Sequence, residues 1–452
     1  MANTLRRPNR ISPQVALILG FFAIIGSGTI LLSLPFASAN NTATNIIDSL
    51  FTAASATGTV GLVVLETSTH WSRAGHIIIL ILMQVGGLGF MAGAILLFMA
   101  LGRPISFGHR QTLAESMSLR AIGGVVGLAK RLLVFTIAVE IVGGLLLFFQ
   151  FQNDKIVGPE DAVFYAVFHS VSAVTVSGFD LIPGSDSLRV YSESPLFLMT
   201  ILFMTIQGDL GFLVVVEIFR KLRFSAMNME TKLVLVLNAF LWPMAGIGFA
   251  LLEWQNANSL GGLPIAHRVT NAVFHGFTVR GAGFSTVDFS MIGELTMIFM
   301  ILFMIVGGAS ASMSSGVRVN TIGALLAAMK SSLTGRPYAE AFGRTITTDR
   351  IHVSITILIL YLTLLFVSVP VIFSLLNAEF SIAKTLFDTA SLIGIVGLST
   401  GLPSELSGLG KVFYSLMMFV GRLGPLLIAL ALLSRRARHG WRKFPASNLR
   451  VG

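Results

Sequence analysis

Apolar residues along the chain fall into long runs, and shorter segments rich in small and hydroxyl side chains separate pairs of these runs. The order of long run, short segment and long run recurs four times. A run of about 20 apolar residues is long enough to cross a bilayer as a helix. The pattern therefore predicts an all-α polytopic membrane protein of four parallel helix–pore loop–helix repeats, with eight transmembrane helices and four pore half-helices around a pseudo-fourfold pore.

The repeats account for nearly the whole chain, and each has an outer helix, a pore helix and an inner helix. We expect one integral membrane domain with repeats at 1–110, 111–228, 229–345 and 346–452. The outer helices are expected near 13–36, 125–151, 230–254 and 351–377. The pore helices are expected near 44–57, 159–174, 265–278 and 380–393, and the inner helices near 73–101, 195–220, 291–329 and 409–434.

Each short segment has a Phe, then small and hydroxyl residues, and finally a glycine followed by Leu or Phe. A half-helix that ends inside the bilayer points its C-terminal carbonyls and the negative end of its dipole at one place, which favours a cation there. The glycine has no Cβ, so the backbone can approach an ion closely. We therefore predict a carbonyl-lined selectivity filter for a cation. Its residues are Thr59, Val60, Gly61, Val176, Ser177, Gly178, Gly281, Ala282, Gly283, Ile395, Val396 and Gly397.

The first of these copies also reads like the start of the Thr-Val-Gly-Tyr-Gly filter of potassium channels, although no Tyr-Gly follows it. The alternative interpretation is that the four segments are only small-residue connections between transmembrane helices. Their fourfold recurrence favours a shared site.

The composition agrees with a membrane protein, since 54% of the residues are hydrophobic and only 12% are charged. The chain has no Cys, which excludes a disulfide framework and a thiolate site. The net charge of +10 could suggest nucleic acid, but the cations cluster beside apolar runs. By the positive-inside rule, the junctions between repeats and both termini are expected to be cytoplasmic, and the pore loops to open outward.

The outward loops carry an acidic residue close behind each filter glycine: Glu66, Asp180, Asp288 and Glu405. A ring of carboxylates at the mouth of a pore would raise the local concentration of cations. Ordinary solvated loop charge is the alternative, and the sequence leaves both interpretations open.

The third inner segment, 291–329, is too long for one straight crossing and contains a Gly- and Ser-rich stretch. We predict a break there. Non-helical backbone at that depth is tolerated only inside protein or facing a water-filled cavity, so we expect a flexible plug below the filter. A small-residue packing face is the alternative. The candidate gate residues of this stretch are Gly307, Gly308, Ser310, Ser312, Ser314, Ser315 and Gly316.

Aligning the inner helices on their small-residue motifs puts Gly87, Asp209, Gly308 and Arg422 at one level. Repeats two and four are opposite each other in a fourfold ring, so Asp209 and Arg422 are expected to face each other across the pore. A charge at that depth costs roughly 2.5–3.5 kcal/mol, which pairing or cavity water relieves. We expect Arg422 to be a barrier to cations that Asp209 partly neutralises, so that Asp209→Asn lowers the flux. An Asp209 that reaches elsewhere is the alternative.

Together these motifs resemble the Trk/Ktr/HKT superfamily of potassium transporters, and the resemblance covers nearly the whole chain. It rests on the four linked units, each with one filter glycine, and on the break in the third inner segment. It also rests on Thr278-Val-Arg-Gly-Ala-Gly-Phe-Ser-Thr-Val-Asp288, Gly394-Ile-Val-Gly-Leu-Ser399 and Gly421-Arg-Leu-Gly424. Eight spans, without an extra helix pair at the N-terminus, are more similar to the Ktr-type pore-forming membrane subunit than to the longer Trk type.

The resemblance implies potassium uptake across the cytoplasmic membrane, with K⁺ bound at backbone carbonyls of the filter and no covalent cofactor. It implies a homodimer on a cytoplasmic ring of nucleotide-binding regulatory subunits that respond to ATP and ADP, so that nucleotide acts only through a partner. Uptake in such systems is often sodium-stimulated, which makes Na⁺ the second candidate ion. Gly61 matches the glycine of potassium-selective members, and an Arg at the position of Arg422 is thought to help the broken segment close the pore.

An intramembrane protease is the competing enzyme, because Gly208-Asp209 and Gly307-Gly-Ala-Ser310 faintly resemble motifs of aspartyl and serine intramembrane proteases. No second intramembrane Asp is apparent, since Asp388 is expected at the start of a pore helix, and no His follows Ser310 in the inner helices to act as a base. His169 and His275 lack companions at metal-ligand spacing and are expected to be hydrogen-bonded structural residues. An inverted-repeat transporter conflicts with the even number of spans in each unit. We therefore expect no enzyme, and the remaining alternative is a sodium or less selective monovalent cation transporter of the same fold.

Overall fold

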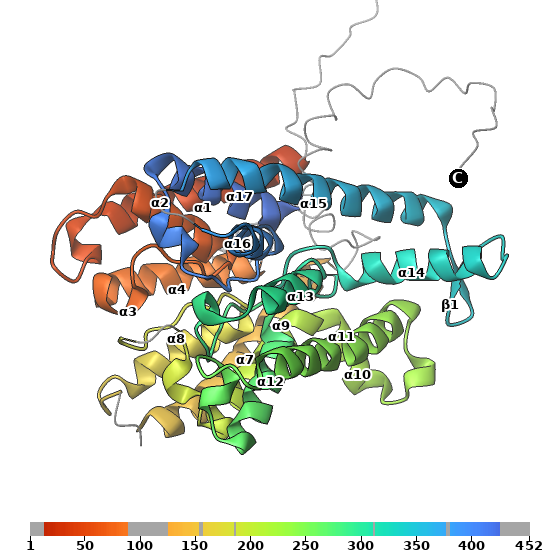
Figure 1. Cartoon of the computed structure of the whole chain (residues 1–452), viewed down its shortest axis with the longest axis horizontal. Coiled ribbons are helices and arrows are strands. Elements are labelled where there is room, and N and C mark those ends of the chain that lie inside the picture. The colour runs from red at the N-terminus through yellow and green to blue at the C-terminus, as the bar shows by residue number, and fades with distance from the viewer. Residues whose placement is uncertain are drawn as a thin grey trace, which may run out of the picture.

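The computed structural model of the protein describes residues 13–88, 125–152, 157–184, 187–310, 312–376 and 380–424. Within these ranges the helices fall into four consecutive sets, each beginning with a long apolar helix (Figure 1). One hairpin joins the third set to the fourth, and in it β1 (Ala339–Ala341) pairs antiparallel with β2 (Arg344–Ile346).

The bounds of the helices follow the chain. The first set has α1 (Pro13–Ser33), α2 (Ile46–Gly58), the short α3 (Thr67–His70) and α4 (Arg73–Leu88). The second has α7 (Val125–Gln152), α8 (Ala162–Val174), α9 (Pro195–Leu210) and α10 (Phe212–Lys221). The third has α11 (Met229–Glu253), α12 (Ile265–Thr278), α13 (Glu294–Met304) and α14 (Val319–Leu333). The fourth has α15 (Thr348–Ser374), α16 (Ile382–Gly394) and α17 (Gly408–Leu423). Short 3-10 helices cover Pro35–Ala37, Arg189–Tyr191, Phe224–Ala226, Leu260–Gly262, Phe289–Met291 and Leu402–Glu405.

The outer and pore helices begin and end within one helical turn of the predicted positions. By length and composition, three helical stretches of the described residues can cross a membrane: Ala129–Gln152, Met229–Glu253 and Thr348–Ser374. The bent pair of α9 and α10 is a fourth if it counts as one span, and several other apolar helices are shorter. The parts of the first and fourth inner helices expected at 89–101 and 425–434 lie outside the described residues.

The prediction of one continuous second inner helix at 195–220 is wrong. α9 ends at Leu210, α10 begins at Phe212, and the two axes differ by 97°. Gly211 between them has φ 76° and ψ 151°, a conformation that a residue with a side chain rarely adopts. The two helices together still have the length and composition of one span, so hydropathy alone gives no sign of the bend.

The third inner segment is broken, as its length and its Gly- and Ser-rich stretch predict. We call the described residues between α13 and α14, 305–310 and 312–318, the break segment. Its two ends are bonded together, because Gly307 N–H donates to Val317 O at 2.9 Å and Val317 N–H donates to Ile305 O at 3.2 Å. The break segment is therefore a loop whose entry and exit lie side by side.

The helices α2, α8, α12 and α16, which we call the central helices, form the buried middle of the fold. One fully buried Phe lies in each: Phe51, Phe168, Phe274 and Phe387. Each central helix packs against an inner helix of the preceding set, α8 against α4, α12 against α9 and α16 against α13. The same contact joins the last set to the first, where α17 packs against α2 (Figure 1). These contacts link the four sets in a closed cyclic order.

Candidate functional site

Each central helix is followed by a turn that contains one non-glycine residue with positive φ. These residues are Thr59, Val176, Ala282 and Ile395, with φ of 53°, 59°, 85° and 57°. Three of the four are β-branched, and for them this conformation costs about 1–3 kcal/mol, a strain that gathers at functional sites. In three sets a backbone hydrogen bond of 2.8–2.9 Å closes the helix end. These bonds run from Val60 to Ser55, from Ser177 to Ser172 and from Val396 to Ser391.

The third turn is one residue shorter than the others. A single residue separates Thr59 from Gly61, whereas Ala282 is followed directly by Gly283. The positive φ of the third turn therefore falls on Ala282, directly before Gly283, and not on Gly281. The third strand of the predicted filter is offset by one position at its helix end.

The four predicted filter glycines meet around one point. A Cβ on Gly61 would collide with the carbonyl oxygen of Ser177, the residue before Gly178. All four glycines also have positive φ, so the backbone requires glycine for two independent reasons. The other three contacts continue in the same direction, with Gly178 against Ala282 O, Gly283 against Val396 O and Gly397 against Val60 O.

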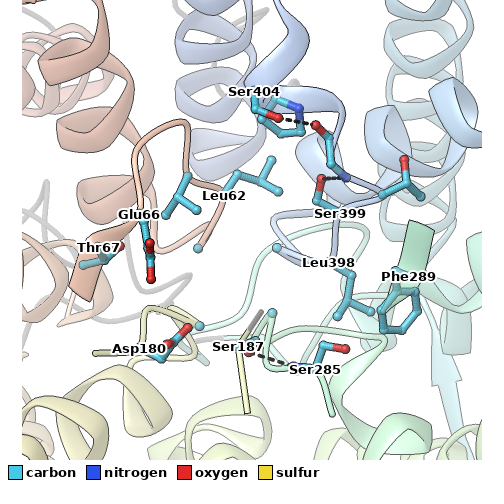
Figure 2. A pocket seen from close by; sticks show the side chains of 18 of the residues that line it. Leu62, Glu66, Thr67, Asp180, Ser187, Ser285, Phe289, Leu398, Ser399 and Ser404 are labelled. Carbon is cyan, nitrogen blue, oxygen red and sulfur yellow. Dashed lines mark hydrogen bonds between the residues drawn. The ribbon is translucent and has the colours of Figure 1, made fainter. Parts of the chain in front are cut away.

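A cavity of about 720 Å³ lies on the side of this ring reached by the residues after the glycines. All four glycines line it, and so do Glu66, Asp180, Asp288 and Glu405. Figure 2 shows Glu66 and Asp180 on neighbouring loops beside the opening. None of the described residues that line the cavity is basic. This gathering favours a negative mouth over scattered loop charge.

Local contacts hold two of these carboxylates. Glu66 accepts a hydrogen bond from Ser68 Oγ at 2.8 Å and one from Gly184 N–H at 3.2 Å, which joins the first and second loops. The bond from Ser68 is the main reason that the pKa of Glu66 is lowered from its ordinary value. Asp288 Oδ2 lies 3.7 Å from Arg189 Nη1, so one charge of the mouth is partly neutralised.

Two histidines connect central helices to the strands beyond the glycines. His169 Nδ1 donates to Tyr165 O at 2.7 Å, which leaves Nε2 as the acceptor for Leu181 N–H at 3.3 Å. His275 Nε2 lies 2.9 Å from Thr286 Oγ1. The expectation that both are hydrogen-bonded structural residues is confirmed, and both partners lie just past a filter glycine.

Asp388 has the same position in the fourth set. It lies in the middle of α16 and is fully buried, so its expected place at the start of the helix is wrong. Its Oδ1 accepts from Ser399 Oγ at 2.6 Å and its Oδ2 accepts from Thr400 N–H at 3.0 Å. The matching residue of the first set, Thr52, donates to Asp48 O within its own helix.

The break segment lies on the opposite side of the ring from the cavity. A Cβ on Gly281 would lie 3.3 Å from Ser314 Oγ, and one on Gly316 would lie 3.4 Å from Gly394 O. The break segment therefore touches the third and fourth turns where they leave their central helices, α12 and α16. Among the predicted gate residues, Gly307, Gly308, Ser314 and Ser315 are buried, and Ser310, Ser312 and Gly316 are half-buried.

Asp209 and Arg422 do not form the direct pair that the sequence predicts. Ser314 Oγ donates to Asp209 Oδ1 at 2.7 Å, and Arg422 Nη1 donates to Met313 O at 2.5 Å. Arg422 Nη2 also donates to Gly86 O at 2.5 Å. The break segment thus bonds to both charged residues. Its contact with Arg422 agrees with what the resemblance implies, whereas its contact with Asp209 was not expected.

Sequence reasoning also missed Arg280, which is 1% exposed and stands three residues before Gly283. Its guanidinium donates to two carbonyls of the break segment and to Asn238. The available signal was a charge inside a pore segment. Arg280 stands two residues before the positive-φ residue of its turn, where the other three copies have Thr57, Val174 and Ile393.

These features define a helical membrane protein whose buried central helices and loops converge on an acidic cavity. The chain belongs to the TrkH family of cation transport proteins, since the family model described as "TrkH: Cation transport protein" matches residues 13–436. The family is one of transporters rather than enzymes. The resemblance stated from the motifs is confirmed.

Relatives agree with this assignment. The chain is 35% identical over 418 residues to "Ktr system potassium uptake protein B" of Bacillus subtilis (strain 168), with 92% of each chain covered. It is 33% identical over 451 residues to "Potassium/sodium uptake protein NtpJ" of Enterococcus hirae, with 98% of each covered. Its fold is similar to the crystal structure of the potassium transporter TrkH from Vibrio parahaemolyticus, with a TM-score of 0.72, 17% identity, and coverage of 98% of this chain and 88% of that one.

Proposed function

We propose that this protein takes up potassium across the cytoplasmic membrane through a channel-like pore. The observation that carries the proposal is the ring in which each of four glycines lies against the carbonyl oxygen before the next. Backbone carbonyls in such a ring can replace the water around a dehydrated K⁺. The acidic cavity beside the ring supports the entry of cations from that side, because clustered carboxylates concentrate cations at the mouth of a pore.

In this proposal the four sets are repeats at 1–110, 111–228, 229–345 and 346–452, arranged with pseudo-fourfold symmetry and with eight transmembrane helices. The cyclic packing of the central helices supports it. Each central helix ends at the ring, where the negative end of its dipole favours a cation. Both termini are cytoplasmic, because the cations cluster at the junctions between repeats.

The break segment is the proposed gate. It lies on the inner side of the ring, and Arg422 donates to Met313 O and holds it there. Arg318 donates to Ala309 O and to Ser314 O, which holds the loop in a compact form. Guanidinium groups at this depth oppose the passage of cations, so a pore with this arrangement is closed.

Transport of both potassium and sodium is the second candidate function. The relative named as a potassium/sodium uptake protein matches nearly the whole chain, which favours it. The unequal strands of the ring also favour a filter that is less strict than four identical strands, because the third turn is one residue shorter. Gly61 supports potassium as the preferred ion through the resemblance described above.

Regulation through a partner completes the proposal. The relative named as protein B of a Ktr system supports a second component, for which we propose a cytoplasmic ring of nucleotide-binding subunits. We propose that the chain is a homodimer in which each protomer has its own pore. Nucleotide would act through these cytoplasmic subunits, and sodium would stimulate uptake.

Flux in proteoliposomes tests the pore. The purified protein is reconstituted with a potassium gradient and without a gradient of sodium or protons, and the entry of K⁺ and of Na⁺ is measured separately. Entry of K⁺ above that in protein-free vesicles, and faster than entry of Na⁺, is expected. A requirement for a second ion gradient would contradict a channel-like pore, and equal rates for both ions would favour the second candidate.

A further inference from the structure

Arg280 joins three parts of the molecule through one buried side chain. Its Nε donates to Val306 O at 2.9 Å and its Nη2 donates to Gly307 O at 2.7 Å, and both acceptors belong to the break segment. Its Nη1 donates to Asn238 Oδ1 at 2.5 Å, in α11. Its own backbone lies in the turn that leads to Gly283.

The chemistry of these contacts makes them interdependent. All three hydrogen-bond acceptors are neutral groups, and the guanidinium is 1% exposed. The carboxylate of Asp209 attracts this charge through space but accepts none of these three hydrogen bonds. A buried charge that loses its hydrogen bonds is strongly unfavourable. If the break segment moves away, two of the three acceptors leave with it. Arg280 must then follow them or stay behind with Asn238 as its one remaining acceptor among these three.

Arg280 is close in the chain to one of the carbonyl groups of the glycine ring. Arg280 stands two residues before Ala282, whose carbonyl oxygen lies against Gly178. In the other three sets the equivalent residue contacts the inner helix by its own carbonyl, which meets a glycine there. Those contacts are Thr57 O with Gly86, Val174 O with Gly208 and Ile393 O with Gly421.

Resting on the proposed function, we propose that Arg280 is a positioning residue that couples the break segment to the third strand of the filter. With the segment closed, Val306 O and Gly307 O hold Arg280 in place, and Asn238 fixes it to the outer helix. When the segment moves, Arg280 moves with its acceptors and shifts the carbonyl of Ala282 relative to the other three strands. Opening and ion discrimination are therefore linked through one side chain.

The same helix provides a matched control. Arg268, near the start of α12, also donates to three backbone carbonyls, those of Leu263 at 2.7 Å, Trp254 at 3.1 Å and Gly261 at 2.8 Å. The guanidinium of Arg268 lies 5.5 Å from the ring centre of Trp254. The guanidinium of Arg280 has a similar neighbour, the ring of Trp242 at 5.9 Å. None of these acceptors belongs to the break segment. Removing Arg268 thus removes comparable bonds without releasing the segment.

A single introduced cysteine reports the position of the segment, because the chain contains no Cys. Ser310→Cys, at a half-buried site of the segment, is treated in proteoliposomes with a positively charged methanethiosulfonate, and the K⁺/Na⁺ flux ratio of the same vesicles is measured. We expect Arg280→Gln to speed modification roughly tenfold or more and to lower the flux ratio roughly threefold. Arg280→Lys keeps the charge but cannot span all three acceptors, so it has intermediate values. Arg268→Gln changes neither.

The outcomes separate the coupling from simpler roles. Faster modification with an unchanged flux ratio contradicts the coupling, and so does an unchanged modification rate. If Arg280→Gln does not fold, Asn238→Ala replaces it and is expected to move both readouts by a smaller factor, whereas a change in one alone contradicts the proposal. The protein without any substitution tests the proposed function independently. If it shows no K⁺ flux, the pore is contradicted, while the modification rates of the Ser310→Cys variants still show whether Arg280 holds the segment.

Discussion

Lys411 Nζ lies 2.7 Å from Asp48 Oδ1, although the two residues are 363 positions apart in the chain. The pair joins the first turn of α17 to the first turn of α2. Arg73 and Asp161 form a pair of the same kind at 2.7 Å, between the start of α4 and the residue that precedes α8. In both cases the carboxylate stands at a helix N-terminus, which the helix dipole favours. The last set is thus tied to the first as the first is tied to the second.

Substitution of Gly61 tests the ring. Gly61→Ser is expected to lower the K⁺/Na⁺ flux ratio roughly tenfold, because its Cβ collides with the carbonyl oxygen of Ser177 and displaces a ligand of the ion. Gly→Asp at any of the four filter positions is expected to abolish K⁺ flux. Flux ratios in proteoliposomes provide the measurement.

Gly401 is the control for backbone strain. It also lines the cavity and has φ 91°, but a Cβ there meets nothing within 4 Å. Gly401→Ser therefore keeps the conformational cost without the collision and should leave the flux ratio unchanged. Equal effects of the two serines would show that strain, and not the ring, sets the phenotype.

The hydrogen bonds from Ser399 and Thr400 to Asp388, which we call the brace, are expected to support the fourth strand. Asp388→Asn keeps the shape of the side chain but replaces one of its two acceptor oxygens with an NH₂ donor, so the bonds from Ser399 and Thr400 cannot all persist. We expect a loss of about 1.5–3 kcal/mol in the free energy of unfolding in detergent, together with weaker discrimination between K⁺ and Na⁺. Thr52→Val, at the matching place in α2, removes only a bond within its own helix. It should cost about 0.5–1.5 kcal/mol and leave discrimination intact, and the reverse order of effects would refute the brace.

The acidic mouth gives a pH-dependent prediction. The lowered pKa of Glu66 keeps its carboxylate charged at a pH where an ordinary glutamate takes up a proton, so its contribution to uptake is lost only as external pH falls through that lowered value. Ser68→Ala removes the largest cause of the shift and should move the loss to higher pH. Glu66→Gln should lower uptake roughly twofold at low salt and limiting K⁺, with no effect at high salt.

Glu193, an exposed acid outside the lining of the cavity, provides the control. Uptake against external pH in the four proteins gives the comparison. If Glu193→Gln and Glu66→Gln have the same effect, the cavity has no special role.

Arg422→Gln and Asp209→Ala separate two accounts of the gate. Each removes a bond to the break segment, from Arg422 to Met313 O or from Ser314 to Asp209, so both variants should raise K⁺ flux several-fold. The direct pair expected from sequence predicts instead that loss of Asp209 lowers the flux. A lower flux in Asp209→Ala beside a higher one in Arg422→Gln would therefore restore the direct pair.

The sequence shows the elements well because their signals are local. Long apolar runs give the outer helices, and the small-residue segments that end in Gly61, Gly178, Gly283 and Gly397 give the central helices and the ring. The break in the third inner segment follows from its length and from its Gly- and Ser-rich stretch. Each of these features depends on residues close together in the chain.

The features that were missed depend on partners far apart in the chain. Arg280 bonds to Asn238 on one side in sequence and to Val306 and Gly307 on the other, and no local pattern connects them. The bend at Gly211 stays hidden because the residues on both sides of it are apolar. The contact between the break segment and Asp209 was missed for the same reason, because Ser314, which donates to Asp209, lies 105 residues further along the chain.

The arginine in the third turn has a consequence for how such a ring can change by mutation. In a ring of four separate identical subunits, one changed codon alters every quadrant, so a single arginine would become four buried cations around one ion path. In the proposed pore one covalent chain supplies all four quadrants, and Thr57, Val174 and Ile393 stand where Arg280 stands in the third. Because separate codons encode the four quadrants, the third strand can acquire a charged side chain that bonds to the proposed gate while the three equivalent positions stay uncharged.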